Sequence, residues 1–124
     1  MIGVGTDIVE IARVEAVWRR QGERFTQRIL TPSEVQTMHT LNEPWRYLAK
    51  RFAAKEAIAK CFGTGIGAKF GWQDVTISNG EEGAPVACLS AAADSLAQSL
   101  GGSRVLLSIA DEKHYAVAFA VLAA

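Results

Sequence analysis

The chain has 124 residues, a hydrophobic fraction of 49% and no net charge at neutral pH, so it can bury about two-thirds of its unfolded surface in one core. This composition excludes intrinsic disorder, and the absence of a basic excess argues against a nucleic-acid-binding domain. We therefore expect a single domain over residues 1–124 and no nucleic-acid partner.

The apolar segments are too short to cross a membrane. The longest, residues 115–124, is about half of the ~20 residues that a spanning helix needs. No basic region precedes an apolar run at the N-terminus, so no signal peptide is predicted. Cys61 and Cys88 fit no metal spacing and no disulfide framework, and their apolar neighbours predict that both fill the core. We expect a cytoplasmic protein without a membrane partner.

Charge is unevenly distributed along this neutral chain. Residues 11–60 hold ten Lys and Arg against five Asp and Glu, whereas residues 61–124 hold three against six. A basic half indicates either an anionic partner of limited extent or a solvated helical surface. The charges by themselves slightly favour the solvated surface.

The first predicted elements are a buried strand at residues 1–5 and a helix, because apolar residues recur at helical spacing from Ile11 to Trp18. Asp7 and Glu10, three residues apart, resemble an N-cap and its capping partner. A carboxylate that follows a strand beside two glycines is also a common metal ligand, since glycine lets a ligand approach the backbone. From these residues alone, the capping interpretation is favoured.

Two further helices are predicted between residues 31 and 62. Thr31 suits the N-cap of the first, Pro32 its first turn, and the Glu34 side chain can bond back to the N-cap. The second helix runs from about residue 44 to 62, and Gly63 is suitably placed to end it.

The second half of the chain favours strands. Four apolar segments read as two β-hairpins, 75–77 with 86–89 and 104–109 with 115–121. An alanine-rich helix capped by Ser90 lies between them. Helices followed by hairpins indicate an α+β fold with a mainly antiparallel sheet. Because the last two strands are apolar on both faces, helices or another subunit are expected to cover the sheet.

Charged residues on the helix at 44–62 could carry chemistry. Glu56 and Lys60 are spaced as a surface ion pair worth ~0.2–0.5 kcal/mol, whereas the like charges of Arg51 and Lys55 are unfavourable unless an anion lies near them. Three cations and one carboxylate before a glycine-rich loop also suit a phosphate–metal site, in which the carboxylate holds Mg²⁺ and the cations neutralise phosphate. Both interpretations stay open.

The glycine-rich loop at residues 63–67 is not a nucleotide-binding motif, because it lacks the P-loop lysine and follows a helix instead of a strand. It does allow the backbone to approach a ligand closely. His39 and His114 have no partners at metal or triad spacing, so a hydrolytic triad is not predicted.

Two segments resemble a known family. Gly-Val-Gly-Thr-Asp-Ile-Val-Glu-Ile at residues 3–11 and Arg-Phe-Ala-Ala-Lys-Glu-Ala-Ile-Ala-Lys-Cys-Phe-Gly-Thr-Gly-Ile-Gly at 51–67 closely resemble the holo-acyl-carrier-protein synthases, the short branch of the phosphopantetheinyl transferases. The resemblance implies a Mg²⁺-dependent enzyme of fatty acid biosynthesis. Such an enzyme moves 4′-phosphopantetheine from coenzyme A to a serine of apo-acyl carrier protein and releases adenosine 3′,5′-bisphosphate.

The resemblance also implies roles for individual residues. Asp7 and Glu56 match magnesium ligands, which replaces the capping interpretation of Asp7. Glu56 and Lys60 are expected to be catalytic, as the base and as the cation beside the departing phosphate. The family is typically a trimer with sites shared between neighbours. With Lys55 added from the charge pattern, the expected coenzyme A contacts are Arg51, Lys55, Gly63, Thr64, Gly65, Ile66 and Pro85. The expected surface for docking the acidic carrier is Arg13, Arg20 and Arg24 of the basic first helix.

One position departs from the family. Many members carry a His where this chain has Asp111, and that His helps to hold the nucleotide end of coenzyme A, so the contact made by residues 111–114 is expected to differ. Two other functions stay open from the residues. One is a magnesium-dependent nucleotide hydrolase with the same carboxylates, and the other is a non-catalytic module whose basic helix binds an acidic partner.

Overall fold

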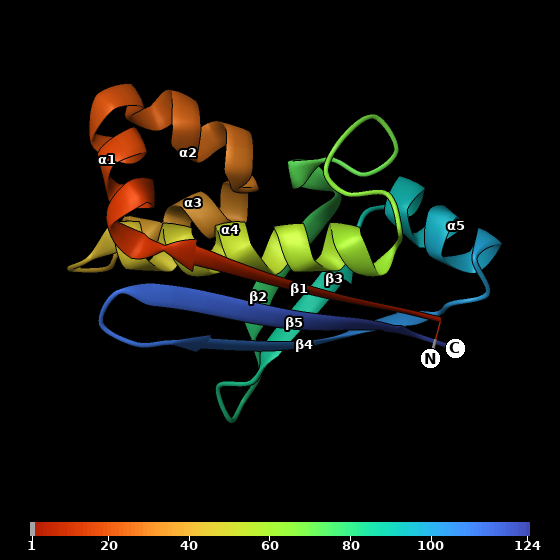
Figure 1. Cartoon of the computed structure of the whole chain (residues 1–124). Coiled ribbons are helices and arrows are strands. Elements are labelled where there is room, and N and C mark those ends of the chain that lie inside the picture. The colour runs from red at the N-terminus through yellow and green to blue at the C-terminus, as the bar shows by residue number, and fades with distance from the viewer. Residues whose placement is uncertain (1) are drawn as a thin grey trace.

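The computed structural model describes residues 2–124, so Met1 of the first predicted strand lies outside it. The fold is α+β, as predicted (Figure 1). The elements in chain order are β1 Gly3–Glu10, α1 Ile11–Gln21, α2 Glu23–Ile29, α3 Pro32–Met38, α4 Pro44–Cys61, the 3₁₀ turn η1 Trp72–Asp74, β2 Val75–Asn79, β3 Pro85–Leu89, α5 Ala91–Ser99, β4 Arg104–Asp111 and β5 Tyr115–Ala123. Within residues 2–124, no helix is both long enough and apolar enough to span a membrane.

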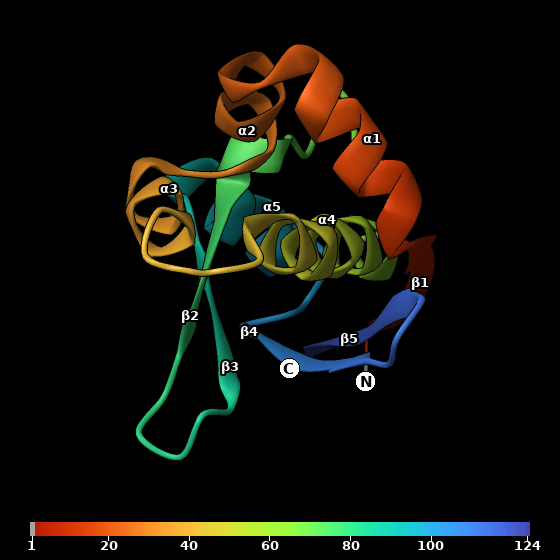
Figure 2. The same cartoon turned by 90° about the vertical axis from the view of Figure 1, so that its left-hand side faces the viewer.

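The strands form two antiparallel sheets. In the first, β5 lies between β1 and β4, and in the second, β2 pairs only with β3. Figure 2 shows the β2–β3 hairpin projecting away from the body of the molecule. Both predicted hairpins are therefore confirmed, and the first strand joins the last one across the whole length of the chain.

Helix α4 lies at the centre, across the inner face of the three-stranded sheet and under α1, α2 and α3 (Figures 1 and 2). Its side chains are buried on nearly all sides, because many of them are alanines that let neighbouring backbones come close. Strand β5 meets it with Ala116, Ala118 and Ala120, all buried.

Asp7 does not cap a helix. Strand β1 continues to Glu10, with Asp7 paired to Ala118 of β5, and α1 begins only at Ile11. Glu10 occupies the N-cap position, yet its side chain makes no capping hydrogen bond. The capping interpretation was wrong because the spacing of nearby residues carries no information about a strand partner at the far end of the chain.

The other local signals are confirmed. The backbone N–H of Thr31 donates to Oε1 of Glu34 at 2.8 Å, which closes the capping box of α3. The N–H of Ala93 donates to the Ser90 hydroxyl at 3.1 Å at the start of α5.

The two cysteines occupy different environments. Cys61 is buried in the core at the end of α4, and burial raises the pKa of its thiol to about 11. Cys88 lies on β3 and is exposed, so the prediction that both cysteines fill the core is wrong for Cys88.

The outer face of the three-stranded sheet is apolar and exposed. Side chains alternate along β5, and Tyr115, Val117 and Phe119, which point away from α4, are exposed. The register places Phe119 beside Thr6 and Ser108 on this face. Helices thus cover one face of the sheet only, and an exposed apolar patch of this kind marks an interaction surface. Its large exposed apolar residues are Val4, Ile8, Leu106, Val117 and Phe119, each 37% exposed or more.

Candidate active site

Gly3 and Gly5 allow β1 to lie directly against α4. A Cβ atom added to Gly3 would overlap the carbonyl oxygen of Cys61, and one added to Gly5 would overlap that of Ala57. Because side chains alternate along a strand, Asp7 points to the same face as these two glycines, toward α4. The glycines therefore position a helix, whereas the sequence had suggested that they admit a ligand.

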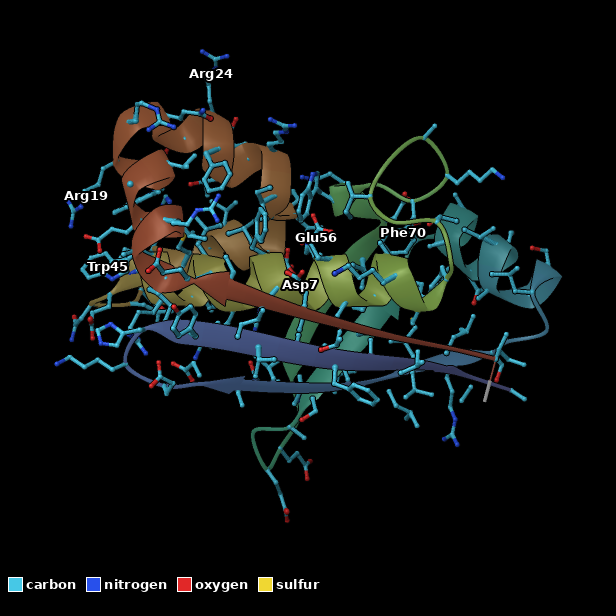
Figure 3. All side chains as sticks on the ribbon, in the orientation of Figure 1. Asp7, Arg19, Arg24, Trp45, Glu56 and Phe70 are labelled. Carbon is cyan, nitrogen blue, oxygen red and sulfur yellow. The ribbon has the colours of Figure 1, made fainter. Side chains whose placement is uncertain are left out.

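Asp7 and Glu56 lie close together between β1 and α4 (Figure 3), and Lys60 of α4 forms an ion pair with Asp7. The Lys60 ammonium donates to Oδ1 of Asp7 at 3.1 Å and to the carbonyl oxygen of Thr6 at 3.0 Å. Asp7 and Glu56 line one cavity of about 460 Å³. Within the described residues Lys60 forms its ion pair with Asp7 and none with Glu56, so the interpretation as a Glu56–Lys60 surface pair was wrong.

Burial raises the pKa of Glu56, the neighbouring Asp7 carboxylate raises it further, and Lys60 opposes both effects. Two carboxylates in one cavity repel each other when both are ionised, and a divalent cation between them would relieve this repulsion. Carboxylate oxygens suit Mg²⁺, which usually retains several waters. Glu10 also lines this cavity, but over residues 2–124 no three His, Cys, Asp or Glu side chains are grouped so that they could hold a metal ion together.

The glycine-rich loop begins directly after the helix that carries Glu56 and Lys60. Gly63 and Gly65 have φ angles of +80° and +66°, and the N–H of Gly63 donates to the carbonyl of Lys60 at 2.9 Å, which ends α4 as predicted. Thr64 is exposed beside this helix end, whereas Ile66 packs against the core.

Arg51 lies on the opposite side of α4 from Lys60, because nine residues are about two and a half helical turns. It is 5% exposed and lines a separate cavity of about 320 Å³. Its guanidinium lies 4.6 Å from the centre of the Tyr47 ring and donates to Oδ1 of Asn79 at 3.0 Å. Asn79 pairs with Pro85 in the β2–β3 hairpin. The buried Nε of Arg51 has no hydrogen-bond partner within residues 2–124, which indicates a place for a ligand acceptor.

Lys55 cannot reach a bound phosphate. It is fully buried, and its ammonium donates to Oε1 of Glu34 at 2.7 Å and to the carbonyls of Ile29 at 2.8 Å and Trp72 at 2.9 Å. These bonds use all three hydrogens of the ammonium. The prediction that Lys55 contacts coenzyme A is therefore wrong, and the anion that its charge requires is the Glu34 carboxylate.

The three arginines of the predicted docking surface are exposed. Arg13 and Arg20 belong to α1, but Arg24 follows the break at Gly22 and belongs to α2, so the basic surface spans two helices. Figure 3 shows Arg24 pointing away from the fold. Arg13 also lines the cavity of Asp7 and Glu56, which connects this surface with the carboxylates.

Asp111 is held by an arginine that the sequence did not single out. Arg46 donates to Oδ2 of Asp111 at 2.9 Å and to the carbonyl of Glu112 at 2.7 Å. These bonds tie the β4–β5 turn to the start of α4, and only the fold brings the two segments together. At the same turn, the carbonyl of His114 accepts a hydrogen bond from the N–H of Ile11 at 2.8 Å.

Comparison with known proteins identifies the family. The model of the 4′-phosphopantetheinyl transferase superfamily matches residues 3–120. The chain is similar to the holo-[acyl-carrier-protein] synthase of Photobacterium profundum, with 51% identity over 98% of this chain and 97% of that protein, and to that of Shewanella halifaxensis, with 53% identity over 98% of each.

Solved structures agree with this match. The holo-[acyl-carrier-protein] synthase of Neisseria meningitidis superposes with a TM-score of 0.94 at 39% identity, covering 100% of this chain and 99% of that one. The Helicobacter pylori enzyme in complex with coenzyme A gives 0.85 at 31% identity, covering 97% and 99%. Because the matches span nearly the whole chain in both sequence and fold, this chain belongs to the 4′-phosphopantetheinyl transferase superfamily.

Proposed function

We propose that this chain transfers 4′-phosphopantetheine from coenzyme A to a serine of an apo-acyl carrier protein in fatty acid biosynthesis, and releases adenosine 3′,5′-bisphosphate. The observation that carries this proposal is the convergence of Asp7, Glu56 and Lys60 beside one cavity in a member of this superfamily. Similar proteins are named holo-[acyl-carrier-protein] synthase, which supports the assignment. So do the structures from Helicobacter pylori, in complex with coenzyme A, and from Bacillus anthracis, in complex with CoA (3′,5′-ADP).

In this proposal, Asp7 and Glu56 would hold Mg²⁺, which when bound neutralises charge on the pyrophosphate of coenzyme A. Glu56 accepts the proton of the carrier serine hydroxyl. The serine oxygen forms a bond to the β-phosphorus. The bond to the bridging oxygen breaks, its electron pair leaves with the nucleotide, and Lys60 stabilises the charge on that departing phosphate.

Coenzyme A would bind between subunits of a homotrimer. The cavity of Arg51 and the cavity of Glu56 share no residue, and Arg51 and Lys60 point to opposite sides of α4. One long ligand can use both sides when they come from neighbouring chains. In this arrangement Arg51 and Pro85 bind the nucleotide end. The loop after Lys60 binds near the pyrophosphate with its backbone and side chains, namely Gly63, Thr64, Gly65 and Ile66.

The carrier protein would dock on the exposed Arg13, Arg20 and Arg24, whose charge complements an acidic partner. Arg13 lies both on this surface and in the cavity of the carboxylates, so a docked carrier could present its serine to Glu56. A cytoplasmic location and action of residues 1–124 as one domain belong to the same proposal.

The test is the intact mass of an apo-carrier protein after incubation with this protein, coenzyme A and Mg²⁺. We expect a gain of one phosphopantetheine, no gain without Mg²⁺, and none with a carrier whose acceptor serine is replaced by alanine. Nucleotide release without any carrier would favour a hydrolase instead. Carrier binding that is insensitive to Mg²⁺ and coenzyme A, without a mass gain, would favour a non-catalytic binding module.

A further inference from the structure

A buried ion pair lies beside Arg51. Lys55 and Glu34 are 0% and 1% exposed, and their charged atoms are 2.7 Å apart. Oε1 of Glu34 also accepts the N–H of Thr31 at 2.8 Å, and Oε2 accepts the N–H of Ile77 at 2.7 Å. The carboxylate is therefore held on both of its oxygens, with Lys55 as its only cationic partner within residues 2–124.

Arg51 lacks a carboxylate partner although Glu34 is near. The two side chains line the same cavity, together with Tyr47 and Asn79. Both are close enough to influence the ionisation of Tyr47 and of Lys55. Nevertheless, the guanidinium forms no ion pair within the described part of the chain, and it donates a hydrogen bond to the neutral amide of Asn79 instead.

We propose that Lys55 is a positioning residue that keeps Arg51 available to the ligand by holding Glu34. A guanidinium and a carboxylate form strong, often bidentate pairs, so two such groups in one cavity join unless another charge intervenes. Without Lys55, Glu34 would be a buried anion lacking a cation, which is strongly unfavourable. Its carboxylate would turn to Arg51 and occupy the position that a ligand phosphate needs.

This inference rests on the proposed function, in which Arg51 binds coenzyme A. Lys55 lies outside the reacting centre, yet in this proposal it affects how tightly the Arg51 half of the site binds coenzyme A. The carboxylates of the other half are held separately, by the contact of β1 with α4, so their affinity for Mg²⁺ should not depend on Lys55.

The test compares single and double variants by calorimetric titration with coenzyme A. Lys55→Met keeps the length of the side chain and removes its charge. We expect its Kd for coenzyme A to rise about 10- to 100-fold, which corresponds to the loss of hydrogen bonds to a charged group. Adding Glu34→Gln should restore the affinity close to wild type, because a neutral amide does not neutralise Arg51. The matched control is Lys50→Met, the same change at a partly exposed position of α4 beside Arg51, and we expect no effect.

Folding of each variant is checked by circular dichroism and thermal unfolding. If Lys55→Met does not fold, Lys55→Gln takes its place, since its amide can still donate to the carbonyls of Ile29 and Trp72. A folded single variant that binds coenzyme A like wild type overturns the role of Lys55. So does a double variant as weak as the single one, because a purely structural role predicts no rescue. A wild type that binds no coenzyme A overturns the proposed function as well.

Discussion

Glu56 owes its altered acidity to the fold around it. Partial burial and the Asp7 carboxylate raise the pKa of Glu56 above its ordinary value, against the influence of Lys60. An acid whose pKa is higher in the folded state than in the unfolded state binds more protons when folded. Stability contributed by this group therefore falls as pH rises from the unfolded pKa through the folded pKa. At neutral pH and without a metal, ionised Glu56 thus opposes folding.

The first prediction concerns this charge. In metal-free protein at neutral pH, Glu56→Gln should raise the Tm, because it removes the cost of burying a charge and the repulsion with Asp7, and should abolish transfer. The difference in Tm should shrink as the pH falls through the pKa of Glu56. Thermal unfolding from about pH 4 to 8 and the carrier mass assay measure both effects. Glu43→Gln, at an exposed position, is the control. Near wild-type transfer by the Glu56 variant would remove it from both the base and the metal role.

The second prediction concerns Lys60. Its side chain is about half exposed, and its ammonium is held by Asp7 and the Thr6 carbonyl. The ammonium can therefore stabilise negative charge that develops on a nearby phosphate. Lys60→Ala should lower kcat about 10²- to 10³-fold, as the loss of a preorganised donor typically does. The KM for coenzyme A should change much less. Steady-state kinetics separates the two constants, and a defect confined to KM would contradict a catalytic role.

At the scale of elements, the crossing of β1 over α4 determines where the carboxylates lie. The strand contributes glycines and the helix contributes Ala57 and Cys61 at this crossing. The backbones therefore touch, and the next residue on that strand face, Asp7, arrives beside Glu56. A larger residue in the strand would move the strand and its carboxylate away from the helix.

The third prediction tests this crossing. The added methyl group of Gly5→Ala would overlap the carbonyl of Ala57, which cannot rotate away as a side chain could, so we expect a loss of about 1–3 kcal/mol in the free energy of unfolding. Transfer should require more Mg²⁺. In Gly71→Ala, the added Cβ meets only Oδ2 of Asp74 at 3.6 Å, an ordinary contact, so this variant is the control. Equal stability of the two variants, measured by denaturant unfolding, would contradict the close packing of strand and helix.

At the scale of the whole molecule, the exposed outer face of the sheet and the separated halves of the site both favour an oligomer. The fourth prediction is that Phe119→Asp, which places a charge in the centre of that face, converts a trimer to monomers and lowers transfer. Leu41→Asp, in the connection between α3 and α4, should leave the trimer intact. Size-exclusion chromatography with light scattering distinguishes the two states. A wild-type protein that is monomeric at assay concentrations would refute the shared site.

The fifth prediction concerns carrier docking. Arg24→Glu should raise the KM for the carrier about two- to fivefold for each surface pair lost. The effect should weaken as salt screens exposed charges. The KM for coenzyme A serves as the internal control and should stay unchanged. An unchanged carrier KM at low ionic strength would place docking on another surface.

Local signals in the sequence were sufficient to predict a structural feature wherever the contact that determines it joins residues close in the chain. The capping box of Thr31 and Glu34, the Ser90 cap and the stop of α4 at Gly63 are such cases, and the structure has all of them. The two hairpins also follow from alternation and turn residues. The motif resemblance singled out Asp7, Glu56 and Lys60, although no spacing rule connects Asp7 with the two residues of the helix.

The partners of Arg51 and Lys55 were decided by the tertiary structure. Helical spacing shows that Arg51 and Lys55 lie on neighbouring faces of one helix, but not which face is buried or against what. Lys55 finds its carboxylate on α3, and Arg51 finds its amide on β2, because both lie inward on a central helix. Burial and partnership arise from contacts between residues distant in the chain, and these form only when the sheet, its covering helices and the hairpin come together.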